Sequence, residues 1–81
     1  MDEITTEQIA QNYSAMGDSV AMINDVIGGN RMETEEAADR QKCVDRNVEH
    51  LELMVAQSYW TDQSMTAVNA AITAGKAYTA S

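Results

Sequence analysis

Apolar side chains recur at alternating spacings of four and three residues along the first third of the chain. This spacing places them on one stripe of an α-helix, because such a helix has about 3.6 residues per turn. Thr5 or Thr6 can cap the helix at its start, and Gly28-Gly29-Asn30 can end it. The pattern therefore predicts a helix over about residues 6–27. The stripe consists of Ile9, Tyr13, Met16, Val20, Ile23 and Ile27.

A second stripe with the same spacing follows after a short connection. Thr34 can cap this segment, and acidic residues after it suit the exposed amides of a first helical turn. Gln41 is a polar interruption within the stripe. Two stripes of matched length joined by a short connection predict an antiparallel helical hairpin. The second stripe consists of Ala37, Val44, Val48, Leu51 and Val55.

The apolar pattern loses its phase beyond Val55, which predicts a break near residue 60. Thr61 or Asp62 can then cap a third helix over about 62–75, with Gly75 and Lys76 at its C-terminus. The alternative is one long second helix, because neither glycine nor proline stands between Thr34 and Ala74. Both versions describe one all-α domain over residues 1–81. The version with a break has helices at about 6–27, 34–60 and 62–75.

Length and charge limit what such a domain can bind. A chain of 81 residues buries little core, and Cys43 is its only cysteine, so association with a partner is the expected source of further stability. Thirteen acidic against five basic residues give a net charge of -8, which argues against nucleic-acid binding. The acidic start and the lack of a long apolar run argue against secretion and membrane insertion. We expect a protein of the cytoplasm, or of a particle assembled there.

No set of residues has the spacing of a catalytic or metal site. Cys43, Asn47 and His50 are the residue types of a thiol-protease triad and share one helix face. Seven helical residues separate Cys43 from His50 by about 10.5 Å, too far for a nucleophile and its base. His50 has no second histidine three or four residues away. The sequence thus predicts no enzyme, no metal and no cofactor.

The C-terminal segment, Ser58–Ser81, carries only two formal charges, Asp62 and Lys76, in an otherwise strongly charged chain. It also holds three of the four aromatic residues. Tryptophan and tyrosine are enriched at protein interfaces, so we expect this segment to contact other subunits. The alternative is that Trp60 closes the end of the hairpin's own core. The expected contact residues are Tyr59, Trp60, Met65, Val68, Ile72 and Tyr78.

Residues 47–78 resemble the closing segment of small, mostly uncharacterised proteins encoded among the structural genes of tailed bacteriophages. The likeness is carried by His50-Leu51, by Trp60 with Asp62, and by the run 67–75. It implies a virion-associated or assembly role and transfers no binding residues. We therefore expect a non-enzymatic structural protein in a homo-oligomer or larger assembly, located in the virion. The alternative is an acidic helical adaptor or regulator that binds one host or viral protein.

Overall fold

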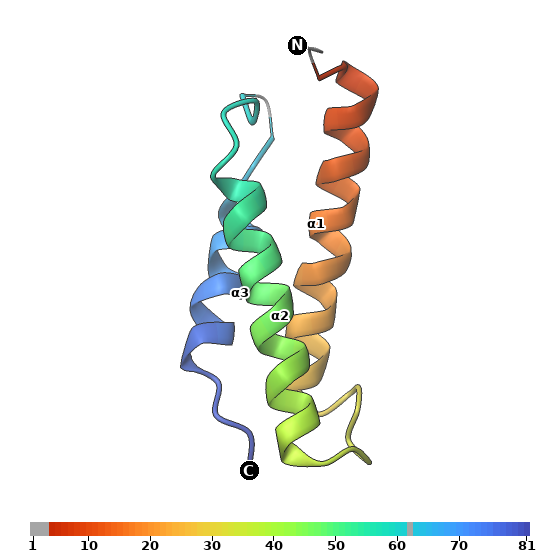
Figure 1. Ribbon diagram of the computed structural model, residues 1–81, viewed down its shortest axis with the longest axis vertical. Coiled ribbons are helices and arrows are strands. Elements are labelled where there is room, and N and C mark those ends of the chain that lie inside the picture. Colours follow the sequence, from red (N-terminus) through yellow and green to blue (C-terminus); the bar gives the residue numbers. More distant parts are fainter. Residues whose placement is uncertain (1–3, 62) are drawn as a thin grey trace.

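Three α-helices form a bundle in the computed structural model, which describes residues 4–61 and 63–81 (Figure 1). The helices are α1 (Thr6–Ile27), α2 (Ala37–Val55) and α3 (Thr66–Ala77). No strand occurs in these described ranges. The all-α prediction is confirmed. α1 and α2 run antiparallel, and α3 returns alongside them in the direction of α1, so that each helix contacts the other two.

The start of α1 follows the predicted capping chemistry. Gln8 N–H donates to Thr5 Oγ1 over 3.1 Å, and Thr5 N–H donates to Gln8 Oε1 over 2.9 Å. Each residue thereby satisfies a backbone amide that the first turn leaves free. At the other end Gly28 N–H donates to Asn24 O, and Gly29 adopts a φ of +77°, which glycine accepts without a steric penalty. Local sequence therefore determines both ends of α1.

The ends of α2 and α3 differ from those predicted. α2 begins at Ala37 with Glu36 as its cap residue, not at Thr34, and it ends at Val55. The continuous second helix is therefore wrong, because α2 ends at Val55 and a separate helix begins at Thr66. α3 begins after Met65, which makes no side-chain capping bond. Thr61 is not its cap, and Asp62 lies outside the described residues.

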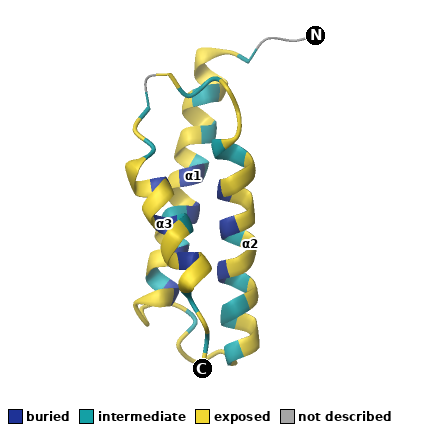
Figure 2. Cartoon of the chain, turned by 90° about the vertical axis from the view of Figure 1, so that its left-hand side faces the viewer, coloured by how far each residue is buried: buried dark blue, intermediate teal, exposed yellow. Residues whose placement is uncertain are grey.

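All three helices contribute to the buried core (Figure 2). On α2 the predicted stripe is confirmed at Val44, Val48 and Leu51. α3 supplies Val68 and Ala71, together with Gly75. Gly75 therefore lies in a packed interface inside the helix, whereas the sequence suggested a role at the helix end. The buried apolar side chains are Met16, Ile23, Val26, Val44, Val48, Leu51, Val68 and Ala71.

The buried face of α1 is rotated relative to its apolar stripe. Met16 and Ile23 are buried as predicted, but Ser19 and Val26 join them, whereas Tyr13 and Ile27 are 38% and 37% exposed. At 100° per residue the two faces are offset by about 60°. Ser19 Oγ lies 3.0 Å from Nδ1 of His50 on α2, which satisfies this buried hydroxyl. One edge of the apolar stripe consequently remains near the surface.

Candidate contact surface

An aromatic cluster closes the end of the bundle where α2 stops. Trp60 Nε1 donates to the carbonyl oxygen of Met54 over 2.6 Å. The ring of Tyr59 lies 4.6 Å from that of Trp60 between centroids, and the ring of Tyr13 lies 6.2 Å away. Asn12 Nδ2 also donates to the hydroxyl oxygen of Tyr59 over 3.1 Å. In this structure Trp60 therefore packs within its own chain, as the alternative interpretation of the sequence describes.

We expect Trp60→Phe to lower the free energy of unfolding by about 1 kcal/mol, because it removes the hydrogen bond to Met54 and keeps most of the ring packing. Urea denaturation followed by circular dichroism measures the loss. Leu53→Ala is the control, since Leu53 is 63% exposed and its truncation should change stability by less than about 0.5 kcal/mol. An unchanged urea midpoint in Trp60→Phe would show that the indole hydrogen bond contributes nothing.

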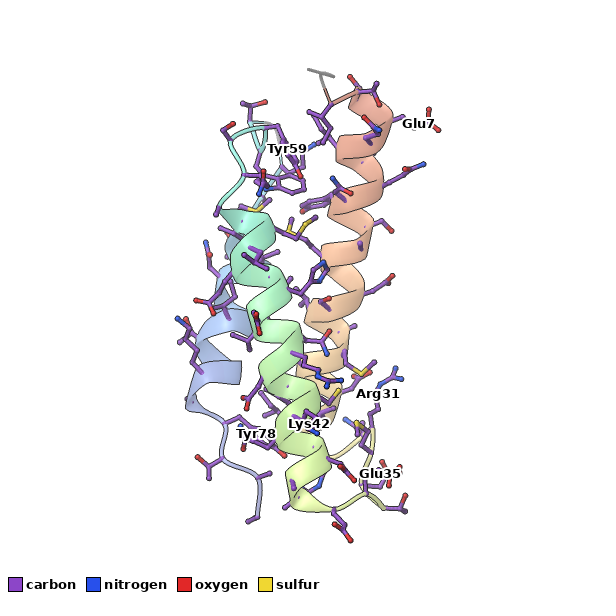
Figure 3. All side chains as sticks on the ribbon, viewed as in Figure 1. Glu7, Arg31, Glu35, Lys42, Tyr59 and Tyr78 are labelled. Carbon is purple, nitrogen blue, oxygen red and sulfur yellow. The ribbon has the colours of Figure 1, made fainter. Side chains whose placement is uncertain are left out.

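The last residues of the chain fold back onto the start of α2. Gln41 Nε2 donates to the carbonyl oxygen of Tyr78 over 3.1 Å, and Gln41 Oε1 accepts from Ala80 N–H over 2.8 Å. Arg40 donates to the hydroxyl of Tyr78 over 3.3 Å and to the carbonyl oxygen of Ser81 over 2.7 Å. Gln41, a polar interruption in the sequence pattern, thus binds the tail through both ends of its amide. Figure 3 shows Tyr59 and Tyr78 at opposite ends of the bundle.

The remaining predicted contact residues also face the interior. Val68 is 4% exposed and belongs to the core, while Met65 and Ile72 are partly buried against it. Five of the six side chains therefore belong to or cover their own core, while Tyr59 packs against Trp60, and their use between molecules stays a prediction. The exposed residues of α3 are instead Thr66, Ala67, Asn69, Ala70, Thr73, Ala74, Lys76 and Ala77. Helical periodicity could have identified Ala70 and Thr73, because they lie on the side opposite Val68 and Gly75.

Cys43, Asn47 and His50, which the helical spacing excluded as a triad, make separate contacts. Asn47 Nδ2 donates to the carbonyl oxygen of Cys43 over 2.8 Å and lies 3.7 Å from its Sγ atom. His50, one turn further along α2, contacts Ser19 of α1 through its Nδ1 atom. Cysteine and histidine therefore have separate partners. Within residues 4–61 and 63–81, no three His, Cys, Asp or Glu side chains form a group that could hold a metal ion.

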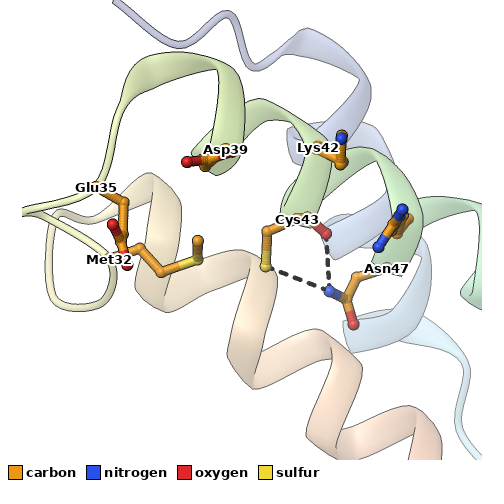
Figure 4. A pocket seen from close by; sticks show the side chains of 7 residues that line it. Met32, Glu35, Asp39, Lys42, Cys43 and Asn47 are labelled. Carbon is orange, nitrogen blue, oxygen red and sulfur yellow. Dashed lines mark hydrogen bonds between the residues drawn. The ribbon is translucent and has the colours of Figure 1, made fainter.

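A shallow pocket of about 380 Å³ lies between the α1–α2 connection and α2 (Figure 4). Its wall combines carboxylates and cations with the thiol of Cys43, which is free and half-exposed. Charges of both signs along one helix are typical of a solvated surface. The arrangement provides no converging acid, base or nucleophile. The lining residues are Met32, Glu35, Asp39, Lys42, Cys43, Arg46 and Asn47.

Charge is distributed unevenly among the helices. α1 carries Glu7, Asp18 and Asp25, and α2 carries four carboxylates, but α3 carries none. The single charge of α3 is Lys76, whose Nζ lies 2.8 Å from Glu52 Oε2 on α2. The outward side of α3 is therefore the least charged helical surface in the described structure.

Comparison of the chain with protein-family models, with curated proteins and with solved structures found no match. None of the three described helices is long and apolar enough to cross a membrane.

Proposed function

We propose that the protein is a non-enzymatic structural protein that docks on neighbouring protein subunits through the outward side of α3, as a small component of a phage particle. The observation that carries the proposal is the contrast between α3, without a single carboxylate, and the acidic surfaces of α1 and α2. Burying ionised groups at an interface is costly, so interfaces favour surfaces that carry few charges.

The strong acidity of the remaining surface fits this role. A net charge of -8 keeps the body soluble and repels nucleic acid, which favours a position away from a packaged genome. We infer a phage particle from the resemblance of residues 47–78 to proteins encoded among phage structural genes. The protein would then be made in the host cytoplasm and incorporated into the virion with its α3 side against another subunit.

Mass spectrometry of purified particles tests this location. We expect peptides of the protein to remain in the particles after washing at high salt, because a largely uncharged interface does not depend on ion pairs. Absence from the particles, combined with a one-to-one complex with a cytosolic protein, would contradict the proposal. That result would support the acidic adaptor instead.

A further inference from the structure

The end of α3 is only weakly stabilised by its own sequence. The helix has 12 residues, a length that is marginal for an isolated helix in water. Gly75 in its last turn lowers the helix propensity further. Lys76 pairs with Glu52 of α2, but both side chains are about half exposed, so this ion pair contributes little. The last turn of α3 therefore depends on other contacts with the chain.

The residues that follow α3 supply such contacts. Residues 78–81, which we call the strap, have no regular secondary structure and lie beside the start of α2 (Figure 1). The ring of Tyr78 packs against the core, and the next residue, Thr79, is exposed. Apart from this ring, the strap is held mainly by polar contacts with the side chains of Arg40 and Gln41.

The side-chain amide of Gln41 uses all of its polar groups in this attachment. Its Nε2 atom donates to the carbonyl oxygen of Tyr78 over 3.1 Å and to Asp45 Oδ1 over 3.0 Å. Its Oε1 atom accepts from Ala80 N–H over 2.8 Å. The reversed amide would set Oε1 against two acceptors, the carboxylate of Asp45 and the carbonyl of Tyr78. Gln41 therefore binds the backbone of the strap in one orientation.

Arg40 contacts both ends of the strap. Its guanidinium donates to the hydroxyl of Tyr78 over 3.3 Å and to the carbonyl oxygen of Ser81 over 2.7 Å. Its Nε atom donates to the carbonyl oxygen of Glu35 over 3.3 Å, which anchors the guanidinium on the connection before α2. The four hydrogen bonds from α2 to the strap thus come from two consecutive residues.

We propose that the strap holds the last turn of α3 against α2 when it is closed, and that it opens without unfolding the rest of the bundle. Opening breaks a few hydrogen bonds near the surface, each of which is exchanged for a bond to water, and removes one tyrosine ring from the core. Unfolding the bundle exposes the buried side chains of three helices. The strap consequently opens far more often than the bundle unfolds.

The state of the strap bears on the surface proposed for docking. Ala74 and Ala77 are exposed residues of the last turn of α3, which the closed strap fixes. A neighbouring subunit that binds this part of α3 needs an ordered helix, so it binds the closed form better and shifts the population toward it. This consequence rests on the proposed function, whereas the opening of the strap does not.

Hydrogen exchange of backbone amides, followed by NMR on the full chain, tests the proposal. In the unmodified protein we expect the Ala80 amide to be protected, because Gln41 accepts its hydrogen bond. It should still exchange at least about tenfold faster than the amides of Val48 and Leu51 in the core of α2. Gln41→Met removes both bonds to the strap and keeps the length and the helix propensity of the side chain. It should speed the exchange of Ala80 by about tenfold and that of Ala77 by at least about threefold, with Val48 and Leu51 within about twofold.

Gln11→Met is the matched control, because it makes the same substitution at an exposed position of α1. Its exchange rates at Ala80 and Ala77 should equal those of the unmodified protein. Faster exchange at both amides in this variant would mean that a loss of stability elsewhere, and not the loss of the Gln41 bonds, accounts for the effect.

Three further results would overturn the inference. The first is an Ala80 amide that exchanges as fast as in an unstructured peptide, since the strap would then not be closed. The second is an Ala80 amide that exchanges no faster than those of Val48 and Leu51, since the strap would then open only when the bundle unfolds. The third is a Gln41→Met variant without faster exchange at both Ala80 and Ala77. The measurement uses no particles, so the strap can fail while the proposed location stands, and the reverse also holds.

Discussion

Ile23→Asp is expected to unfold the protein. Ile23 is fully buried on α1, and its Cγ2 atom lies in the interface where α3 contacts α1 and α2, 3.6 Å from the position of a Cβ built on Gly75. A carboxylate at this position would be enclosed by apolar side chains without a partner. Burying an unpaired charge costs several kcal/mol, whereas a domain of this size is stabilised by only about 5 kcal/mol. Far-UV circular dichroism should therefore show loss of most helical signal at neutral pH.

The control for this prediction is Ala21→Asp, which adds the same side chain to the same helix at an exposed position. Its helical signal should stay near that of the unmodified protein, with at most a modest loss of stability from the lower helix propensity of aspartate. If Ile23→Asp and Ala21→Asp were equally helical, Ile23 could not lie in the core described for α1.

The core of α2 could be predicted from the sequence because its apolar residues follow one helical stripe. Val44, Val48 and Leu51 are all buried. The stripe of α1 was less informative, because the buried face of α1 includes the polar residue Ser19, which an apolar pattern does not count. Its buried face is therefore displaced from the centre of its apolar residues. Ser19 in particular could not have been identified as buried, since its partner His50 lies 31 residues away.

The break after Val55 could also be predicted, from the loss of phase, but the start of α3 could not. Capping side chains are the usual sequence signal for a helix start, and neither Glu36 at α2 nor Met65 at α3 makes a side-chain capping bond. Packing of Val68 and Ala71 against the other helices stabilises α3 in place of a cap. Local signals thus located the start of α1 and not the other two.

The aromatic residues show why composition alone misplaces a contact surface. Trp60 and Tyr78 have the chemistry of interface residues, and both have polar partners within their own chain, Met54 for Trp60 and Arg40 for Tyr78. Tyr78 is held through Arg40 and Gln41, which lie almost forty residues earlier. No periodic pattern encodes such pairs. Part of the C-terminal segment, which carries few charges, still lies at the surface. This part is the exposed side of α3, which includes Ala67, Ala70 and Ala74.

Gly75→Ala should destabilise the bundle, although alanine favours a helix more than glycine does. A Cβ atom on Gly75 would collide with Cγ2 of Val48 and stand 3.4 Å from Cγ1 of Val44. Valine has little freedom at χ1, so α3 must move away from α2 to admit the methyl group. Overpacking typically costs about 1–3 kcal/mol, which exceeds the gain of up to about 1 kcal/mol in helix propensity. Urea denaturation should show a net loss of about 1–2 kcal/mol.

Gly17→Ala is the matched control, because it makes the same substitution in α1 at a position with open space around it. It therefore reports the effect of alanine on helix propensity without the packing collision expected at Gly75. Nothing lies within 4 Å of the added methyl group, so we expect a gain of about 0.5–1 kcal/mol. Combining Gly75→Ala with Val48→Ala should lose less stability than the two single changes summed, because removing the Val48 methyl groups makes room for the new one. Equal shifts for Gly17→Ala and Gly75→Ala, or strict additivity of the pair, would mean that α3 does not pack on α2 through Gly75.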